Sequence, residues 1–184
     1  MRLFVSIDLA DDLTEGVAGV QERFADASGL SFTDPAKAHV TLKFLGDTDP
    51  ERVPAIADAV SAAVDDVDFG SFEAEFGGLG VFPSLDYISV VWLGVRDGSQ
   101  AMTLLHEAIE PRVYDLGFEP EEHDFTPHVT LARMEHAGGK ELVQEVVRDG
   151  DPTVGSMEVD QVRLTESELT ADGPVYSTVE AFDL

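Results

Sequence analysis

The spacing of apolar residues predicts strands and helices that alternate along the chain. Strands are expected where polar and apolar residues alternate, or where a short apolar run is bounded by turn residues. Helices are expected where apolar residues recur every three or four positions behind a capping residue. The expected strands are 3–9, 30–33, 39–45, 69–76, 87–95, 128–131, 154–164 and 175–182, and the expected helices are 12–28, 50–64, 97–116 and 139–148.

Two glycine-containing segments predict connections. Residues 77–83 (Gly-Gly-Leu-Gly-Val-Phe-Pro) lack the Gly-x-Gly-x-x-Gly spacing and precede no helix, so a tight passage is favoured over a phosphate-binding loop. Asp172-Gly173-Pro174 separates the last two expected strands and predicts a hairpin between them.

The tetrapeptide His-Val-Thr-Leu occurs twice, at 39–42 and at 128–131. Its alternation is that of a half-buried strand, so each copy presents histidine and threonine on one face and anchors valine and leucine on the other. The two histidines are 89 residues apart, and the midpoints of the preceding apolar strands are 84 residues apart. Strand, helix, motif strand and helix thus recur in order, which indicates an internal duplication.

The duplication predicts a single α+β domain, residues 1–184, made of two similar lobes. We expect two pseudo-symmetric antiparallel sheets with helices on their outer faces. The two motif strands would face each other across a central cleft.

Two histidines in such a cleft have the chemistry of an acid–base pair. An imidazole titrates near neutral pH, so one ring can accept a proton while the other donates one. His39 and His128 are therefore the candidate catalytic residues, although this reasoning does not say which is the acid. Thr41 and Thr130 would donate hydrogen bonds to phosphate oxygens, or else serve as ordinary strand residues.

Other polar and aromatic residues have weaker signals. Lys43 continues the phase of His39 and Thr41 and would reach the cleft, or form a solvated edge charge. Arg133 is out of phase and reaches the cleft only if its strand bends or ends. The remaining histidines, His106, His123 and His136, are expected at the surface. Phe82 and Phe125 could stack a base but are expected to pack in the core or at a strand end.

Charge separates this chain from most nucleic-acid-binding proteins. It carries 37 acidic and 11 basic residues, a net charge of −26. An acidic surface adapted to high salt is favoured over one built to meet a basic partner, because molar salt screens the self-repulsion. Such a surface argues against extended contacts with a phosphate backbone.

Several classes of protein and compartment are disfavoured. There is no cysteine, which excludes disulfides and thiolate metal sites. No apolar run approaches the roughly 18 residues of a membrane span. The opening strand is interrupted by Asp8 and does not resemble a signal peptide, so we expect a cytoplasmic protein with no membrane contact, and a monomer.

At these motifs the sequence resembles the 2H phosphoesterase superfamily and, within it, the RNA 2′,3′-cyclic phosphodiesterase family, historically called 2′-5′ RNA ligases. The resemblance spans essentially the whole chain. It is carried by residues 2–8, His39 to Gly46, Gly80 to Pro83 with 87–94, Pro127 to Arg133, and 169–176.

The resemblance implies a bilobal fold and hydrolysis of a terminal RNA 2′,3′-cyclic phosphate to a 2′-phosphomonoester. It implies that His39 protonates the departing 3′ oxygen while His128 activates water, with no metal or other cofactor. The expected ligands are RNA 3′ ends or small cyclic nucleotides, held in a locally basic cleft by Lys43 and Arg133. Alternatives are 2′-5′ joining of tRNA halves, a non-catalytic module that binds RNA or nucleotide ends, and a metallohydrolase.

Overall fold

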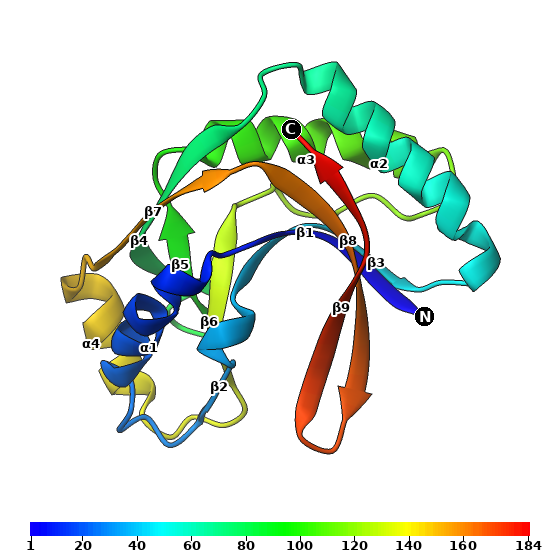
Figure 1. The fold of residues 1–184 in the computed structure, drawn as a ribbon. Helices are drawn as coiled ribbons and strands as arrows, with labels where there is room; N and C mark the ends of the chain where they lie inside the picture. The colour runs from blue at the N-terminus through cyan, green and yellow to red at the C-terminus, as the bar shows by residue number, and fades with distance from the viewer.

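Nine strands and four helices make up the computed structural model, which describes all residues 1–184 (Figure 1). The strands are β1 (Arg2–Asp8), β2 (Leu30–Phe32), β3 (His39–Asp47), β4 (Phe72–Pro83), β5 (Ile88–Val95), β6 (His128–Met134), β7 (Thr153–Val159), β8 (Gln161–Thr170) and β9 (Gly173–Asp183). The helices are α1 (Thr14–Glu22), α2 (Val53–Val67), α3 (Ser99–Tyr114) and α4 (Lys140–Asp149). Short 3₁₀ turns occur at Asp11–Leu13 (η1), Pro35–Lys37 (η2) and Pro50–Arg52 (η3).

All nine strands belong to one antiparallel sheet, in the order β7-β4-β5-β6-β3-β1-β8-β9, with β2 beside β6. The expectation of two separate pseudo-symmetric sheets is therefore not confirmed. The two motif strands, β3 and β6, are hydrogen-bonded neighbours that pair at Val40 and Val129, and this one contact makes the sheet continuous. The α+β class and the covering helices are as expected.

The helices lie in two pairs outside the sheet (Figure 1). Helices α2 and α3 lie side by side over the half that contains β3, while α1 and α4 flank the other half. The β8–β9 hairpin projects from the body on the opposite side of an open arch from η2 and β2 (Figure 1). No helix is long and apolar enough to cross a membrane.

Two expected elements differ from the structure for packing reasons. Residues 77–83 continue strand β4 instead of forming a connection. Gly80 has no side chain, so the indole ring of Trp92 can pack directly against its backbone. An added Cβ would lie 2.1 Å from that ring. The expected long strand 154–164 is divided at Asp160 into β7 and β8. Strand β7 pairs with β4, whereas β8 pairs with β1, so the chain passes from one half of the sheet to the other at this residue.

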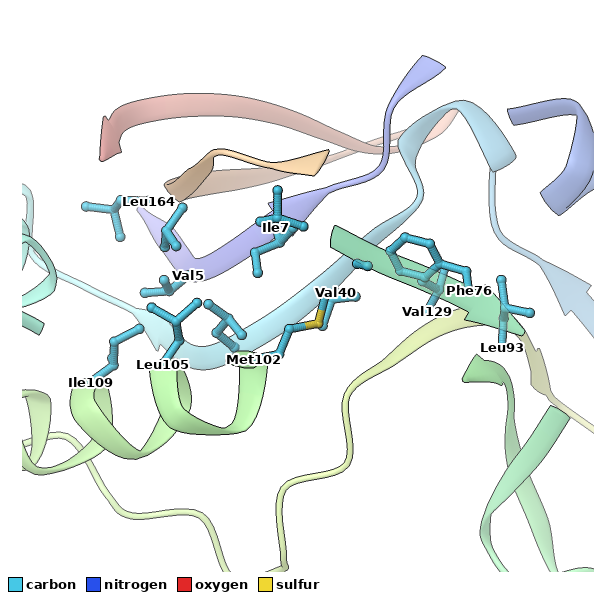
Figure 2. Packing of buried hydrophobic residues seen from close by; sticks show 14 of the residues in the cluster. Val5, Ile7, Val40, Phe76, Leu93, Met102, Leu105, Ile109, Val129 and Leu164 are labelled. Atoms are coloured by element: carbon cyan, nitrogen blue, oxygen red, sulfur yellow. The ribbon is translucent and has the colours of Figure 1, made fainter. Parts of the chain in front are cut away.

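The core lies between the sheet and the helices that cover it. Figure 2 shows Met102, Leu105 and Ile109 of α3 directed toward the sheet. All three are 0% exposed, as their helical spacing requires. The sheet residues of the same cluster include Val5, Ile7, Val40, Phe76, Leu93, Val129 and Leu164 (Figure 2).

We expect Leu105→Ala to lower the free energy of unfolding by about 2–5 kcal/mol, because it leaves a cavity under the motif strands. The neighbouring Leu104 is 42% exposed, so Leu104→Ala is the matched control and should change stability by less than about 0.5 kcal/mol. Urea unfolding at constant salt measures both. Equal losses for the two variants would contradict this placement of α3.

Candidate active site

The two His-x-Thr triplets lie side by side in the sheet. Strands β3 and β6 are antiparallel and pair at Val40 and Val129. Continuing that register puts His39 across from Thr130, and Thr41 across from His128. A local two-fold axis through the paired valines therefore relates the triplets.

A cavity of about 580 Å³ opens over these residues. Both histidines and both threonines line it, but from adjacent strands of one sheet and not from strands that face each other across a cleft, as was expected. Its walls come from β2 with η2 on one side and from the β8–β9 hairpin on the other. The lining comprises Ser31, Phe32, Thr33, Asp34, Lys37, Ala38, His39, Thr41, His128, Thr130, Arg133, Asp172, Gly173, Pro174 and Tyr176.

Each catalytic candidate is oriented by a backbone carbonyl two residues earlier. The Nδ1 of His39 lies 2.9 Å from the Lys37 carbonyl oxygen, and the Nδ1 of His128 lies 2.7 Å from that of Thr126. A carbonyl only accepts, so Nδ1 must carry the proton in both rings. In the neutral ring Nε2 is then the free acceptor, and in the charged ring it is the free donor.

Aromatic rings hold each imidazole in place. His39 packs against Phe4 and Tyr176, with centroid distances of 5.0 and 5.2 Å. His128 packs against Phe82 and Trp92, at 4.9 and 6.0 Å. Each histidine is thus held both at its Nδ1 atom and by two neighbouring rings, which limits it to a narrow range of orientations.

The environment of His128 favours a neutral ring. Burial lowers the pKa of His128 from its usual value near 6.5, and the positive charges of Arg133 and His39 lower it further. The hydrogen bond to the Thr126 carbonyl acts in the opposite direction but does not outweigh burial. The His128 ring is therefore uncharged at neutral pH, with its Nε2 atom unprotonated.

Matching bulges after the triplets decide which cations enter the cavity. In β3 the pairing with β1 skips Leu42, and in β6 the pairing with β5 skips Leu131. Each bulge reverses the alternation of the residues that follow. Arg133 consequently turns into the cavity, while Lys43 turns into the core and is 3% exposed.

Lys43 instead holds the segment that leads into β6. Its ammonium donates to the Glu119 carbonyl at 2.8 Å and contacts the carboxylates of Glu110 at 3.2 Å and Glu121 at 3.4 Å. Lys43 is thus absent from the cavity that both histidines share, although it lines an adjoining pocket of about 500 Å³ with Thr41 and His128. A strict alternation of faces predicted the wrong side because it took no account of the bulge.

His106 also differs from the prediction. It was expected at the surface but is 8% exposed. Its Nδ1 lies 2.7 Å from the Leu42 carbonyl oxygen, and its ring stacks on Phe125 at 4.3 Å. Its position on the apolar face of α3, between Met102 and Ile109, was the available signal. His106 and Lys43 together join β3 to the segment before His128.

Tyr176 and Lys37 are among the cavity-wall residues that sequence reasoning missed. Tyr176 follows Pro174 by two positions, and this alternation places both on the inner face of the hairpin. Burial raises the pKa of Tyr176, so its phenol stays protonated at neutral pH. Lys37 donates from its ammonium to the Pro174 carbonyl at 2.7 Å, which connects η2 to the hairpin.

No group of three or more His, Cys, Asp or Glu side chains is arranged to share a metal ion. The polar groups that converge on the cavity are imidazoles, hydroxyls and cations with Asp34 and Asp172 at its wall. Such a set suits an anionic ligand.

Comparison with known proteins identifies the family. A model described as the 2′-5′ RNA ligase superfamily matches residues 7–170. Relatives named RNA 2′,3′-cyclic phosphodiesterase from Methanothermobacter thermautotrophicus and Archaeoglobus fulgidus are each 33% identical, over 100% of this chain and 99% and 100% of theirs. The chain therefore belongs to the 2′-5′ RNA ligase superfamily of 2H phosphoesterases, and the resemblance seen in the motifs is confirmed.

Solved structures share the fold. A protein from Thermus thermophilus is 26% identical with a TM-score of 0.81, covering 100% of this chain and 98% of that one. E. coli LigT in complex with 3′-AMP is 22% identical with a TM-score of 0.81, covering 100% and 97%.

We expect the pKa of His128 to lie below 6.5 and to rise toward that value in Arg133→Met, because the variant removes a nearby positive charge. Arg148→Met removes an exposed arginine of α4 outside the cavity and should leave that pKa unchanged. NMR titration of the imidazole signals measures the pKa of His128 in the wild type, in Arg133→Met and in Arg148→Met. The His128 signal is assigned by its loss in His128→Asn. A wild-type value above 6.5 would contradict the burial argument.

We expect Lys43→Met to lower the free energy of unfolding by about 1–3 kcal/mol, since it removes the buried cation beside the partly buried Glu110 carboxylate and leaves the Glu119 carbonyl without its donor. The double variant Lys43→Met with Glu110→Met removes both charges and should recover most of that loss. Denaturant unfolding of the two variants separates a buried pair from a solvated lysine, for which Lys43→Met would be nearly neutral.

Proposed function

We propose that the chain hydrolyses the terminal 2′,3′-cyclic phosphodiester of RNA to a 2′-phosphomonoester. The observation that carries this proposal is the pair of histidines, each with Nδ1 bound to a carbonyl, that share one cavity with two threonines and an arginine. The names of the full-length relatives point to the same reaction.

His128 is the general base in this proposal. Its lowered pKa keeps Nε2 unprotonated at neutral pH, ready to accept a proton from an attacking water. His39 lies on the other motif strand and acts as the general acid. The local two-fold that relates the two histidines supports an arrangement with acid and base on opposite sides of a bound phosphate, as in-line displacement requires.

The proton and bond changes balance without a further reactant. The water oxygen forms a bond to phosphorus as His128 takes the water's proton. The bond between phosphorus and the 3′ oxygen breaks, and His39 gives that oxygen its proton. The products are a 2′-phosphomonoester and a free 3′ hydroxyl, with His39 neutral and His128 protonated until the protons re-equilibrate with solvent.

Arg133, Thr41 and Thr130 stabilise the charge that develops on the non-bridging oxygens. All three line the cavity beside the histidines. Hydrogen-bond donors fixed before the reaction stabilise a transition state more than mobile water does. Lys43 has no part in this, since its ammonium is bound in the core.

The position of the cations supports the proposed substrate class. The chain has a net charge of −26, yet Lys37 and Arg133 both line the cavity. An extended RNA would meet a repulsive acidic exterior, whereas a strand end needs to place only its last phosphate groups in the cavity. RNA 3′ ends and small cyclic nucleotides are therefore the proposed ligands.

The test uses an oligoribonucleotide with a 2′,3′-cyclic phosphate end, incubated with excess chelator in low and molar salt. We expect a 2′-phosphate product in the wild type. His39→Ala and His128→Ala should each lower kcat by about 10²–10⁴, because each removes one proton transfer, with ligand affinity kept within about tenfold. His136→Ala is the control, because His136 is exposed and outside the cavity.

Three results would contradict parts of this proposal. Unchanged rates in both histidine variants would exclude the acid–base pair. A 3′-phosphate product would reverse the assignment of the leaving oxygen. Loss of wild-type turnover on chelation, restored by added metal, would favour a metal-dependent hydrolase.

A further inference from the structure

One of the two carbonyls that orient the catalytic histidines lies in a segment without regular structure. The Thr126 carbonyl, which binds the Nδ1 atom of His128, belongs to the connection between α3 and β6 (Figure 1). No backbone group of residues 119–127 is hydrogen-bonded to another backbone group. Four of these nine residues are acidic, so like charges also repel one another along the segment. Local interactions therefore do not fix the position of the Thr126 carbonyl.

The corresponding carbonyl at His39 is fixed locally. It belongs to Lys37 in the η2 turn, and the Lys37 backbone N–H donates to the Asp34 carbonyl at 3.0 Å. The Asp34 carboxylate accepts from the Ala36 N–H at 2.9 Å, which caps the turn. The orienting carbonyl of His39 thus lies in a turn that closes on itself, whereas that of His128 needs support from distant residues.

Glu110 of α3 supplies part of that support. Its carboxylate accepts a hydrogen bond from the Glu121 backbone N–H at 2.8 Å and contacts the Lys43 ammonium at 3.2 Å. Lys43, which is 3% exposed, donates in turn to the Glu119 carbonyl at 2.8 Å. Glu110 therefore binds the segment directly and also holds the lysine that binds it two residues earlier.

His106, one helical turn before Glu110, contacts the segment next to Thr126. Its ring stacks on Phe125 with centroids 4.3 Å apart and an angle of 9° between the planes. Its Nδ1 atom lies 2.7 Å from the Leu42 carbonyl oxygen in the bulge of β3. The hydrogen bond fixes the ring, because a carbonyl only accepts and Nδ1 must hold the proton. His106 therefore connects β3 to the residue immediately before Thr126.

Close packing does not replace these contacts. A pocket of about 500 Å³ is lined by residues 121 and 123–126 of the segment and by 41–44 and His128 of the motif strands. The segment is therefore not packed against the strands along its whole length, as it would be in a close-packed core. Its position depends on the few side chains that reach it.

We propose that Glu110 and His106 are positioning residues for the general base, an inference that rests on the proposed reaction. By fixing the segment before β6, they hold the Thr126 carbonyl on the Nδ1 proton of His128 and keep Nε2 free to accept a proton from water. Without them the neutral imidazole exchanges between its two tautomers, and the tautomer with the proton on Nε2 cannot act as the base. Neither residue lines the cavity that both catalytic histidines share, so they act on the rate and not on binding.

The direct test is the position of the proton on His128, measured from the nitrogen-15 shifts of its neutral ring. We expect the wild type to carry the proton on Nδ1. In Glu110→Ala the two nitrogen shifts should move toward each other, because the second tautomer becomes populated. Glu110→Gln keeps an oxygen acceptor for the Glu121 N–H and should retain the wild-type shifts. The ring of His39 is the internal control and should be unchanged in every variant.

The same variants are assayed with the oligoribonucleotide that ends in a 2′,3′-cyclic phosphate. Glu110→Ala should lower kcat by roughly 10- to 100-fold, as expected for a displaced catalytic group, and leave KM within about threefold. The hydrogen bond to the Thr126 carbonyl raises the pKa of His128, so loss of this bond lowers that pKa. The acidic limb of kcat/KM, on which the base must lose its proton, should therefore move to lower pH. A variant that is only less folded would lower the plateau and leave the limb in place.

Matched variants separate positioning from stability. Glu107→Ala removes an exposed carboxylate from the same helix and should resemble the wild type. His106→Ala removes the contact with Phe125 and should resemble Glu110→Ala in kcat and in the nitrogen shifts. The double variant Lys43→Met with Glu110→Met is expected to recover stability, yet it lacks both side chains that bind residues 119–121. It should therefore be folded, as thermal unfolding would show, and still populate the second tautomer.

Unchanged nitrogen shifts of His128 in both Glu110→Ala and His106→Ala would overturn the proposal, as would a lower kcat with no movement of the acidic limb. Equal effects of Glu110→Gln and Glu110→Ala would also overturn it, because charge and not position would then be responsible. If the wild type does not hydrolyse the oligoribonucleotide, the proposed reaction fails instead. The nitrogen shifts then still decide whether α3 fixes the His128 ring.

Discussion

The hydrogen-bonded pairing of β3 with β6 at Val40 and Val129 is the contact on which the rest of the structure depends. It joins two halves of the chain that each contain a strand, a helix and a His-x-Thr triplet into one sheet. Because the strands are antiparallel there, the pairing also creates the local two-fold that relates His39 and His128. Separating these two strands would divide the sheet in two and would also remove the cavity that both strands line.

The bulges at Leu42 and Leu131 decide the electrostatics of the cavity. One bulge directs Arg133 into the cavity, and the other withdraws Lys43 to the carboxylates of Glu110 and Glu121. A strongly acidic chain thereby keeps an arginine in the cavity beside the two histidines while using Lys43 to anchor the segment before His128. In a protein with a charge of −26, such local placement matters more than net charge for binding an anion.

Much of the fold and part of the site could be predicted from the sequence. Hydrophobic periodicity located the helices and most strands, and the repeated tetrapeptide identified the two histidines and two threonines that line the cavity. Exceptions arose where long-range contacts overrode local pattern. Gly80 continues a strand because Trp92 fills the space above it, and His106 is buried because the Leu42 carbonyl and Phe125 supply its partners.

The sequence by itself determined which residues alternate, how the halves repeat and which side chains can exchange protons near neutral pH, since these properties depend on residue type and spacing alone. The tertiary structure decided that the halves share one sheet and that Arg133 and not Lys43 faces the cavity. These outcomes depend on strand register and on bulges. Register and bulges are set by which strands meet, and neighbours distant in the chain make that choice.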